Sequence, residues 1–574
     1  MLIAAARLLG NLLRLPLLPL WWLGRLVGRP RGDWLSIRLR PRLVELPRIR
    51  PFLARWIPGV ARVLPTPLSA LHRLAELVGA DPHLRGVVVE IPHMHAGWAQ
   101  CAGVRDAIAR MRDRGVRVVA YLPQGGGSRE MWVASSAERV LLGRQATLIA
   151  TGLSIESRYL KPLLDKLGIA VRPMAQGEYK SAAENLARDS MSEPQREQLS
   201  ALLATLERAL VGGIASLPGM DEERARALFD RGLVRGEDAV EAGFASGLCY
   251  EDELPLALTE DDRPAKLVPA GRYLSFHEAR FFSRVLRRPY VAVVDVHGPI
   301  VSDMPGLGRS AADPASLAAA LRAVRRDRFA AGVVLHVSSP GGSAVASDLI
   351  HREVVRLREK KPVVACFGDV AASGGYYVAA PAHAIVAQPV TITGSIGVVS
   401  AKVVAAELLE SVGVRTETLR SAPHADMFSP ARELSEEERG IVDRELAAFY
   451  RVFVSIVAEG RGRPVEEIEP LARGRVWSGA DAHERGLVDR LGGLDAAVEE
   501  VRARAAVPER LRRSLAPRRV RPRRFDLPPA EPPSRAAAAL ALAGRLAPEA
   551  VALLDLLASG DRVLYYAPDL PRVD

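Results

Sequence analysis

The 574-residue sequence predicts an α/β protein made of two tandem copies of one domain, preceded by an apolar N-terminal anchor segment. Three observations support this prediction. Similar segments recur at an offset of about 245 residues. Within each copy, apolar runs alternate with longer amphipathic stretches, which is typical of right-handed βαβ units around a largely parallel sheet. The first thirty residues are apolar but are interrupted by arginines.

The repeat depends on four matches that occur in the same order in both copies. The segment GVVVEIPHMHAGW from Gly86 matches GVVLHVSSPGGSA from Gly332, and RVVAYLPQ from Arg117 matches PVVACFGD from Pro362. Further on, LLDKLGIAVRPM pairs with LLESVGVRTETL, and GLVRGEDAVEAGF pairs with GRVWSGADAHERGL. The offset is too long for a solenoid, so the sequence predicts two domains, at residues 56–285 and 286–506.

Residues 1–55 are predicted to form a membrane-anchor region. The longest uncharged run, residues 15–24, is much shorter than the about 20 residues that a simple membrane span needs. Paired tryptophans at Trp21 and Trp22, with nearby arginines that can snorkel, favour an anchor lying in the membrane interface. A cleaved signal peptide is the main alternative, and a span with snorkelling arginines also remains open.

The positive charge is concentrated at the two ends of the chain. The net charge is +11, yet residues 1–60 contribute about +9 and residues 510–524 about +8, so the remainder is mildly acidic. Basic ends beside apolar sequence fit an anionic membrane surface, and no nucleic-acid-binding motif is present, so we expect no nucleic-acid partner. Residues 507–574 are predicted to be an Arg- and Pro-rich linker followed by a helical tail, which is either an interaction or membrane-surface element or an ordinary docking helix.

Three glycine-containing motifs of the second copy carry the candidate chemistry. HVSSPGGSA leads from a buried strand into a turn in which backbone N–H groups can approach a ligand. GDVAASGGYYVAA places Ser373 before two glycines, a setting in which its oxygen can be exposed at a strand-to-helix turn, although a capped, close-packed helix start is the simpler interpretation. TGSIGVVS follows with Ser395.

Taken together and in this order, these motifs resemble the signal peptide peptidase A family, in its long tandem form, of the Clp-protease and crotonase superfamily. The resemblance covers residues 60–506 and implies two tandem domains of the Clp-protease/crotonase type. It also implies Ser373 as the nucleophile and Gly342 and Gly374 as the donors of the oxyanion hole. The general base that it implies is Lys180, in the motif GEYKSAAE of the first copy, with Ser395 orienting the lysine.

The repeat offset indicates that the copies have divided these roles. Lys180 corresponds to Ala425, so the second copy lacks the base, whereas Ser373 corresponds to Ser128, which is followed by Arg129 and Glu130 in place of two glycines. We therefore predict that the first copy supplies the lysine and is not a second active site. The chain has only seven lysines among 78 basic residues, and arginine does not deprotonate in proteins, so a retained lysine favours a base.

Other catalytic arrangements are less well supported by the residues. His383, ten residues after Ser373, is placed by its sequence in a turn and not in a catalytic position. The remaining histidines and the three scattered cysteines have no ligand spacing, so we expect no metal site and no disulfide framework. No cofactor is required by a serine–lysine mechanism, and none is predicted.

The function predicted is therefore that of a membrane-associated serine endopeptidase with a Ser373–Lys180 dyad. The resemblance implies that it hydrolyses signal peptides or other unfolded apolar peptides at the bacterial inner membrane, bound peripherally or by its N-terminal anchor. It also implies a homo-oligomer, a tetramer in the family. The alternatives are a crotonase-like acyl-CoA enzyme and a non-catalytic membrane scaffold of the same fold.

Overall fold

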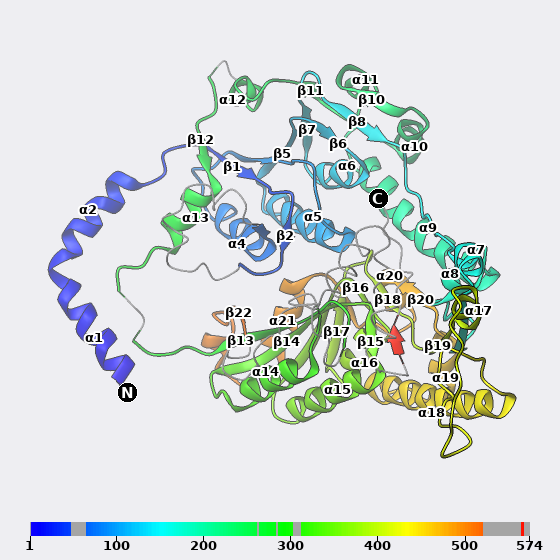
Figure 1. The fold of residues 1–574 in the computed structure, drawn as a ribbon. Helices are drawn as coiled ribbons and strands as arrows, with labels where there is room; N and C mark the ends of the chain where they lie inside the picture. Colours follow the sequence, from blue (N-terminus) through cyan, green and yellow to red (C-terminus); the bar gives the residue numbers. More distant parts are fainter. Residues whose placement is uncertain are drawn as a thin grey trace. The chain divides into compact units, whose positions relative to one another are not determined.

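The computed structural model of the protein describes residues 2–47, 65–260, 263–282, 285–301, 311–520 and 564–566 (Figure 1). Contacts divide the chain into two units. Unit 1 contains Met1–Leu153 and Leu206–Pro289, and unit 2 contains Ser154–Thr205 and Tyr290–Asp574. The segment Ser154–Thr205, which lies in the first sequence copy, is thus packed as part of unit 2. The boundaries predicted for the two sequence copies stay a prediction, because contacts group residues by proximity and not by similarity.

Unit 1 is built on a six-stranded, all-parallel sheet in the order β11-β7-β5-β4-β1-β12. The apolar runs identified in the sequence are its central strands, which are almost wholly buried, as expected for a parallel sheet covered on both faces. A second sheet has the order β10-β8-β6, and β2 pairs with β3. The strands are β1 (Trp34–Arg38), β2 (Leu43–Val44), β3 (Thr66–Pro67), β4 (Gly86–Glu90), β5 (Arg117–Leu122), β6 (Gly125–Gly126), β7 (Arg139–Leu142), β8 (Thr147–Ala150), β10 (Gly232–Arg235), β11 (Gly247–Leu248) and β12 (Leu267–Pro269).

The helices of unit 1 alternate with these strands along the chain, as the βαβ pattern predicts. Helix α5 follows β4 and helix α6 follows the short strand β6, in the order that the second copy repeats. The helices are α1 (Leu2–Arg14), the 3-10 helix η1 (Leu15–Leu17), α2 (Leu18–Gly28), α4 (Leu68–Val78), α5 (Trp98–Arg112), α6 (Ser128–Ala134), α10 (Glu222–Asp230), α11 (Gly236–Glu241), α12 (Leu254–Ala257) and α13 (Ala270–Glu278). Helix α9 (Glu193–Ala215) contains the boundary between the units.

The apolar N-terminal segment is helical but leaves much of its apolar surface uncovered. Trp21 packs against Phe281 with a ring-centroid distance of 5.4 Å, and the Arg25 guanidinium lies 4.2 Å from the centroid of the Phe276 ring. Many other apolar side chains of α1, η1 and α2 are exposed: Leu8, Leu9, Leu12, Leu13, Leu15, Leu17, Leu20, Trp22, Leu23, Leu26 and Val27. Within the described ranges, no helix combines the length and the hydropathy needed to cross a membrane.

Unit 2 is built on an eight-stranded sheet whose main path is β20-β18-β16-β14-β13-β22, with β17 and β21 continuing from β16. Every pair is parallel except β18 with β20. The strands are β13 (Tyr290–His297), β14 (Ala330–Ser339), β16 (Val363–Ala372), β17 (Ala384–Ala387), β18 (Ile392–Gly394), β20 (Val476–Ser478), β21 (Arg490–Leu491) and β22 (Pro517–Arg519).

A second sheet of unit 2 brings together strands from distant parts of the sequence. Its order is β15-β23-β19-β9, and each described pairing in it is antiparallel. Its members are β9 (Ala170–Gln176), β15 (Gly341–Ser343), β19 (Val398–Val404) and β23 (Leu564–Tyr566). Because β9 pairs with β19 over seven residues, the segment from the first copy is joined to the second copy by backbone hydrogen bonding.

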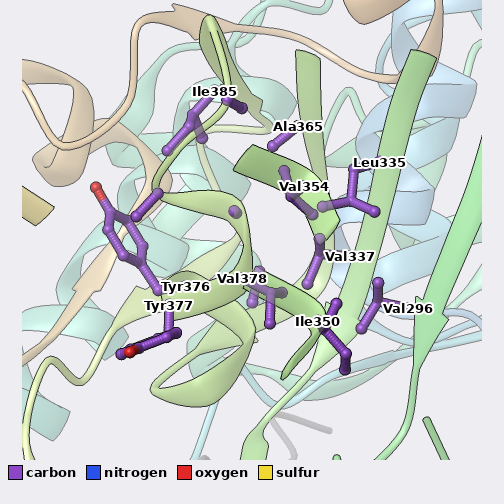
Figure 2. Packing of buried hydrophobic residues seen from close by; sticks show 14 of the residues in the cluster. Val296, Leu335, Val337, Ile350, Val354, Ala365, Tyr376, Tyr377, Val378 and Ile385 are labelled. Atoms are coloured by element: carbon purple, nitrogen blue, oxygen red, sulfur yellow. The ribbon is translucent and has the colours of Figure 1, made fainter. Parts of the chain in front are cut away.

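The helices of unit 2 bury apolar faces against the main sheet. Figure 2 shows Ile350 and Val354 of α15 and Val378 of α16 beside the β14 side chains Leu335 and Val337, all of them buried. The helices are α7 (Lys161–Lys166), α8 (Glu184–Ala187), α14 (Pro314–Arg326), α15 (Ala344–Arg358), α16 (Gly374–Ala379), α17 (Ala406–Ser411), α18 (Glu436–Arg461), α19 (Val465–Ile468), η4 (Glu469–Leu471), α20 (Gly479–Glu484), α21 (Leu494–Arg504) and α22 (Glu509–Arg512). The junction of β16 with α16 positions the candidate nucleophile, Ser373.

Parts of the predicted organisation lie outside the described residues. Residues 48–64 belong to the predicted anchor region and the start of the first copy, and residues 521–563 and 567–574 belong to the predicted linker and helical tail. The helical tail predicted after the linker therefore remains a prediction.

Candidate active site

Ser373 lies at the junction between β16 and α16, where it is the residue before the first helical turn. Its backbone has φ 55° and ψ −120°, a left-handed conformation that is uncommon for a residue with a side chain. The backbone N–H of Ser373 donates to the carbonyl oxygen of Gly394, and Tyr377 N–H donates to the Ser373 carbonyl oxygen. A strained serine held at a strand-to-helix turn is the arrangement of a nucleophile elbow.

The two residues after Ser373 are glycines for a steric reason. A Cβ atom at Gly375 would lie 2.6 Å from the carbonyl oxygen of Ser339, closer than such atoms approach in proteins. Gly374 is the first residue of α16, so its N–H has no acceptor within the helix and is available to a ligand. The Ser-Gly-Gly sequence thus combines close packing against β14 with a free donor next to the serine.

Gly342 lies in β15, in the turn that the sequence predicted as part of an oxyanion hole. A Cβ atom there would lie 2.0 Å from the carbonyl oxygen of Ile300, which requires glycine at this position. Ser343 N–H donates to the same carbonyl, and its hydroxyl caps α15 by accepting from Ala346 N–H. The turn is therefore fixed by backbone hydrogen bonds to Ile300 and by the Ser343 hydroxyl that caps α15.

Lys180 lies in the turn between β9 and α8 and is brought to Ser373 within unit 2. Its Nζ atom donates to Ser373 Oγ at 2.8 Å, to the Ser395 carbonyl oxygen at 2.9 Å and to Ser395 Oγ at 3.0 Å. The Lys180 side chain is only 6% exposed, and Ser373 is fully buried. The sequence-predicted residues Ser373, Lys180 and Ser395 therefore form one hydrogen-bonded cluster.

Burial determines the protonation behaviour of this cluster. Removal from water disfavours the charged ammonium, and this desolvation lowers the pKa of Lys180 well below the ordinary value for lysine. A lysine with a lowered pKa can hold its nitrogen lone pair near neutral pH and can accept a proton from a neighbouring hydroxyl. Chemically, the pair can activate a serine oxygen for attack on an acyl carbon.

Ser395 is held in a conformation that presents two oxygens to the amine. Its φ is 50°, and its N–H donates to the Arg475 carbonyl oxygen. Both its carbonyl oxygen and its hydroxyl accept from Lys180 Nζ. With two of its positions occupied by Ser395, the Lys180 nitrogen directs its remaining position at Ser373 Oγ. This arrangement is compatible with the orienting role that the resemblance implied for Ser395.

Two other sequence candidates make hydrogen bonds of their own and are not members of this cluster. Ser128 is in unit 1, where its hydroxyl donates to the Gly152 carbonyl oxygen. His383 accepts a hydrogen bond from Val363 N–H through Nδ1, a local contact at the start of β16. Among the described residues, no cluster of His, Cys, Asp and Glu has the spacing of a metal site.

Sequence reasoning missed the residues that hold the lysine-bearing turn. Gln198 of α9, buried to 3% exposure, contacts both neighbours of Lys180, and Arg473 accepts the Tyr179 N–H through its carbonyl oxygen. A glutamine inside an amphipathic helix gives no signal of such a role. Gly474, the residue after Arg473, packs against Lys180. A glycine at this position does not reveal that contact in the sequence, because the contact depends on the fold.

Comparison with known proteins identifies the family of this chain. The model of peptidase family S49 matches the chain twice, over residues 110–263 and 355–508. The chain belongs to peptidase family S49. The two matches confirm the tandem arrangement, and the S49 assignment confirms the predicted family.

Named relatives of this S49 chain agree with the assignment. It is 33% identical to "Serine protease SPPA, chloroplastic" of Arabidopsis thaliana over 75% of its own length and 64% of that protein. It is 31% identical to "Protease 4" of Salmonella typhi, covering 73% of the chain and 69% of the relative. For "Protease 4" of Haemophilus influenzae the identity is 29%, with 73% and 70% covered. These names confirm the predicted class, a serine peptidase, and membership implies peptide substrates.

Proposed function

We propose that this S49 chain is a membrane-associated serine endopeptidase in which Ser373 is the nucleophile and Lys180 is the general base. The observation that carries the proposal is the 2.8 Å hydrogen bond from Lys180 Nζ to Ser373 Oγ, made by a lysine whose pKa is lowered by burial. The cluster has the parts that nucleophilic catalysis requires: an activated serine, a base within reach and a third group that orients the base.

The catalytic cycle is an acyl transfer in two halves. Neutral Lys180 takes the proton of Ser373 while the serine oxygen attacks the peptide carbonyl carbon, and the amides of Gly342 and Gly374 stabilise the oxyanion. Protonated Lys180 then gives this proton to the leaving amine as the C–N bond breaks. Water, deprotonated by the same lysine, then attacks the acyl-enzyme carbonyl. Collapse of the second oxyanion breaks the ester C–O bond and releases the acid, and protonated Lys180 returns its proton to Ser373 Oγ.

Peptides bind as an extended strand between β15 and β19. Support comes from β23, which pairs antiparallel with Gly341–Ser343 of β15 and also contacts Val399 of β19. The two edges therefore accept an extended segment, here from the chain's own C-terminal region. Main-chain pairing of this kind recognises unfolded polypeptide with little regard to sequence and excludes folded chains.

If the C-terminal strand competes with substrate for this position, weakening it should help substrate to bind. Tyr565→Pro removes a strand N–H and should lower KM severalfold with kcat unchanged, because proline is poorly tolerated inside a sheet. Tyr565→Phe, which keeps the backbone donor, is the matched control. An unchanged KM in Tyr565→Pro would mean that peptides bind elsewhere.

The membrane part of the proposal depends on the N-terminal helices. Exposed leucines and Trp22, together with the arginines of this segment, suit an element that lies in the interface of an anionic bilayer, as at the bacterial inner membrane. Deletion of residues 2–30 should release the protein from vesicles in a flotation assay and leave peptide hydrolysis intact. Unchanged flotation would refute the anchor. The homo-oligomer expected from the resemblance is a further part of the proposal.

The test of the catalytic assignment uses an unstructured apolar peptide whose products are identified by mass spectrometry. Internal cleavage should occur, and a serine-directed fluorophosphonate should label Ser373 in a tryptic digest. Labelling at another serine with Ser373 unmodified would overturn the proposal.

A further inference from the structure

A buried side-chain amide, that of Gln198, forms hydrogen bonds with the turn that carries Lys180. Gln198, on α9, donates through Nε2 to the Tyr179 carbonyl oxygen at 3.2 Å and to Ser181 Oγ at 3.1 Å. Tyr179 and Ser181 are the two sequence neighbours of Lys180. The Gln198 side chain therefore holds the backbone of Tyr179 on one side of the lysine and the hydroxyl of Ser181 on the other.

The Gln198 amide also bonds to β20, the strand that pairs with β18 just before Ser395. Val476 N–H, at the start of β20, donates to Gln198 Oε1 at 3.1 Å. A backbone N–H can only donate, so the amide oxygen must face Val476 and the amide nitrogen must face the turn. Every polar atom of the Gln198 amide thus has a partner that fixes its orientation.

β20 connects the Gln198 amide with Ser395, whose oxygens accept from the Lys180 amine. Val476 is paired with Gly394 of β18, and the next residue of that segment is Ser395. The N–H of Ser395 donates to the carbonyl oxygen of Arg475, the residue before Val476. Since Ser395 accepts twice from Lys180 Nζ, Gln198 connects the backbone of Lys180 with the acceptors that aim its amine.

Close packing makes this connection stiff. A Cβ atom at Gly474 would lie 2.6 Å from the Cβ of Lys180, and Tyr179 N–H donates to the Arg473 carbonyl oxygen at 2.9 Å. The backbone of residues 473–476 therefore lies directly against the lysine-bearing turn. A loss of the Gln198 bridge would allow these two segments to shift relative to each other.

The charged groups around the turn are paired with one another. Glu197 accepts from Tyr179 Oη and from Arg475, each at 2.8 Å, and the hydrogen bond to Glu197 raises the pKa of Tyr179. Glu178 pairs with Arg473 at 3.4 Å. Burial is what lowers the pKa of Lys180, so a new charge at position 198 would act on a base that is otherwise governed by desolvation.

We infer that Gln198 is a positioning residue for the general base, fixing both the backbone of Lys180 and the Ser395 acceptors so that the amine stays directed at Ser373. The inference rests on the proposed function. It explains why a glutamine is buried at this point of α9, since its amide supplies two donors and one acceptor that no apolar side chain could replace.

The test compares two buried glutamines on the same helix. Gln195, 1% exposed, accepts from Tyr159 Oη, which lies outside the Lys180 turn, so Gln195→Leu is the matched control for Gln198→Leu. Gln198→Leu should lower kcat by about 10- to 100-fold with KM within about twofold, because small misplacements of a catalytic group have effects of this size. Gln195→Leu should leave kcat near that of the wild type.

A second variant separates positioning from folding. Gln198→Glu keeps the shape of the side chain, but it loses the amide donors and brings a negative charge that favours protonated Lys180. The alkaline-rising part of its pH–rate profile should therefore move to higher pH, whereas that of Gln195→Leu should not. This variant decides the question if Gln198→Leu does not fold.

Three outcomes would overturn the inference: equal effects of the two leucine variants, a change in thermal stability or KM alone in Gln198→Leu, and an unmoved profile in Gln198→Glu. Failure of the proposed function is distinguishable, because then Ser373→Ala and Lys180→Ala would also retain activity. If those two are inactive while Gln198→Leu and Gln198→Glu behave as wild type, only the role of Gln198 is refuted.

Discussion

The turn at Ser373 in unit 2 and the turn at Ser128 in unit 1 hold equivalent positions in the two copies. In unit 1, Gly126 of β6 pairs with Leu148, and in unit 2, Ala371 of β16 pairs with Thr393. Each residue of the second pair lies 245 positions after its counterpart in the first pair. Ser128 nevertheless begins its helix without the positive φ of Ser373. The same place in the fold thus carries a strained serine in one copy and a relaxed serine in the other.

The second residue after each serine explains this difference. Gly375 allows the Ser373 turn to lie against β14, whereas the corresponding residue of the first copy is Glu130. The Glu130 carboxylate is buried and accepts from the N–H groups of Met94 and Gly127 at 2.6 and 2.8 Å. Backbone donors near Ser128 are therefore occupied by the protein's own carboxylate. A copy can thus keep its hydroxyl and its fold while losing the geometry of a nucleophile.

The largest expected effect separates these two serines. Ser373→Ala and Lys180→Ala should each reduce kcat for peptide hydrolysis by about 10⁴-fold or more, because nucleophile and base act as a unit. Ser128→Ala should retain most of the wild-type rate. Rates are compared on the same unstructured peptide after circular dichroism has confirmed folding. A large loss in Ser128→Ala would show that the first copy is catalytic.

A smaller effect is expected from making the second turn resemble the first. Gly375→Ala adds a Cβ atom that would lie 2.6 Å from the Ser339 carbonyl oxygen, so the backbone beside Ser373 must shift. We expect kcat to fall by about 100-fold, as shifts of catalytic groups by about 1 Å do in other enzymes. The matched control is Glu130→Gln in the first copy, which should leave hydrolysis unaffected. Equal rates for wild type and Gly375→Ala would remove the steric explanation.

The buried lysine should also reduce the stability of the fold. Its folded-state pKa is lowered, so the folded state disfavours the proton that the unfolded chain binds, and this penalty disappears as the pH rises toward the ordinary lysine pKa. Lys180→Met should raise the unfolding temperature at pH 7 by about 2 °C or more and by less at pH 10. The control is Lys161→Met, because Lys161 is partly exposed and its amine is paired with Asp165 at the surface. A destabilised Lys180→Met at pH 7 would contradict a desolvated base.

The sequence predicted the tandem α/β architecture because the parallel strands are short apolar runs with a clear repeat. The resemblance of its motifs to the signal peptide peptidase A family singled out Ser373, Lys180 and Ser395, which the structure brings into one hydrogen-bonded cluster. It could not predict that Ser154–Thr205 packs in unit 2, because strand pairing between β9 and β19 depends on partners more than 200 positions apart. The contacts of Gln198 could not be predicted for a related reason. Its three hydrogen-bond partners come from two segments that lie close together only in the fold.

The pH dependence of peptide hydrolysis tests most directly whether buried Lys180 is the base for Ser373. Only unprotonated Lys180 can accept the serine proton, and burial lowers the pKa of this lysine well below its ordinary value. We predict that kcat/KM, measured on an unstructured apolar peptide, rises with pH from about 6 and levels off well below the ordinary lysine pKa of about 10.4. A profile that is flat between about pH 6 and 9, or that first rises near the ordinary lysine pKa, would contradict a buried lysine base.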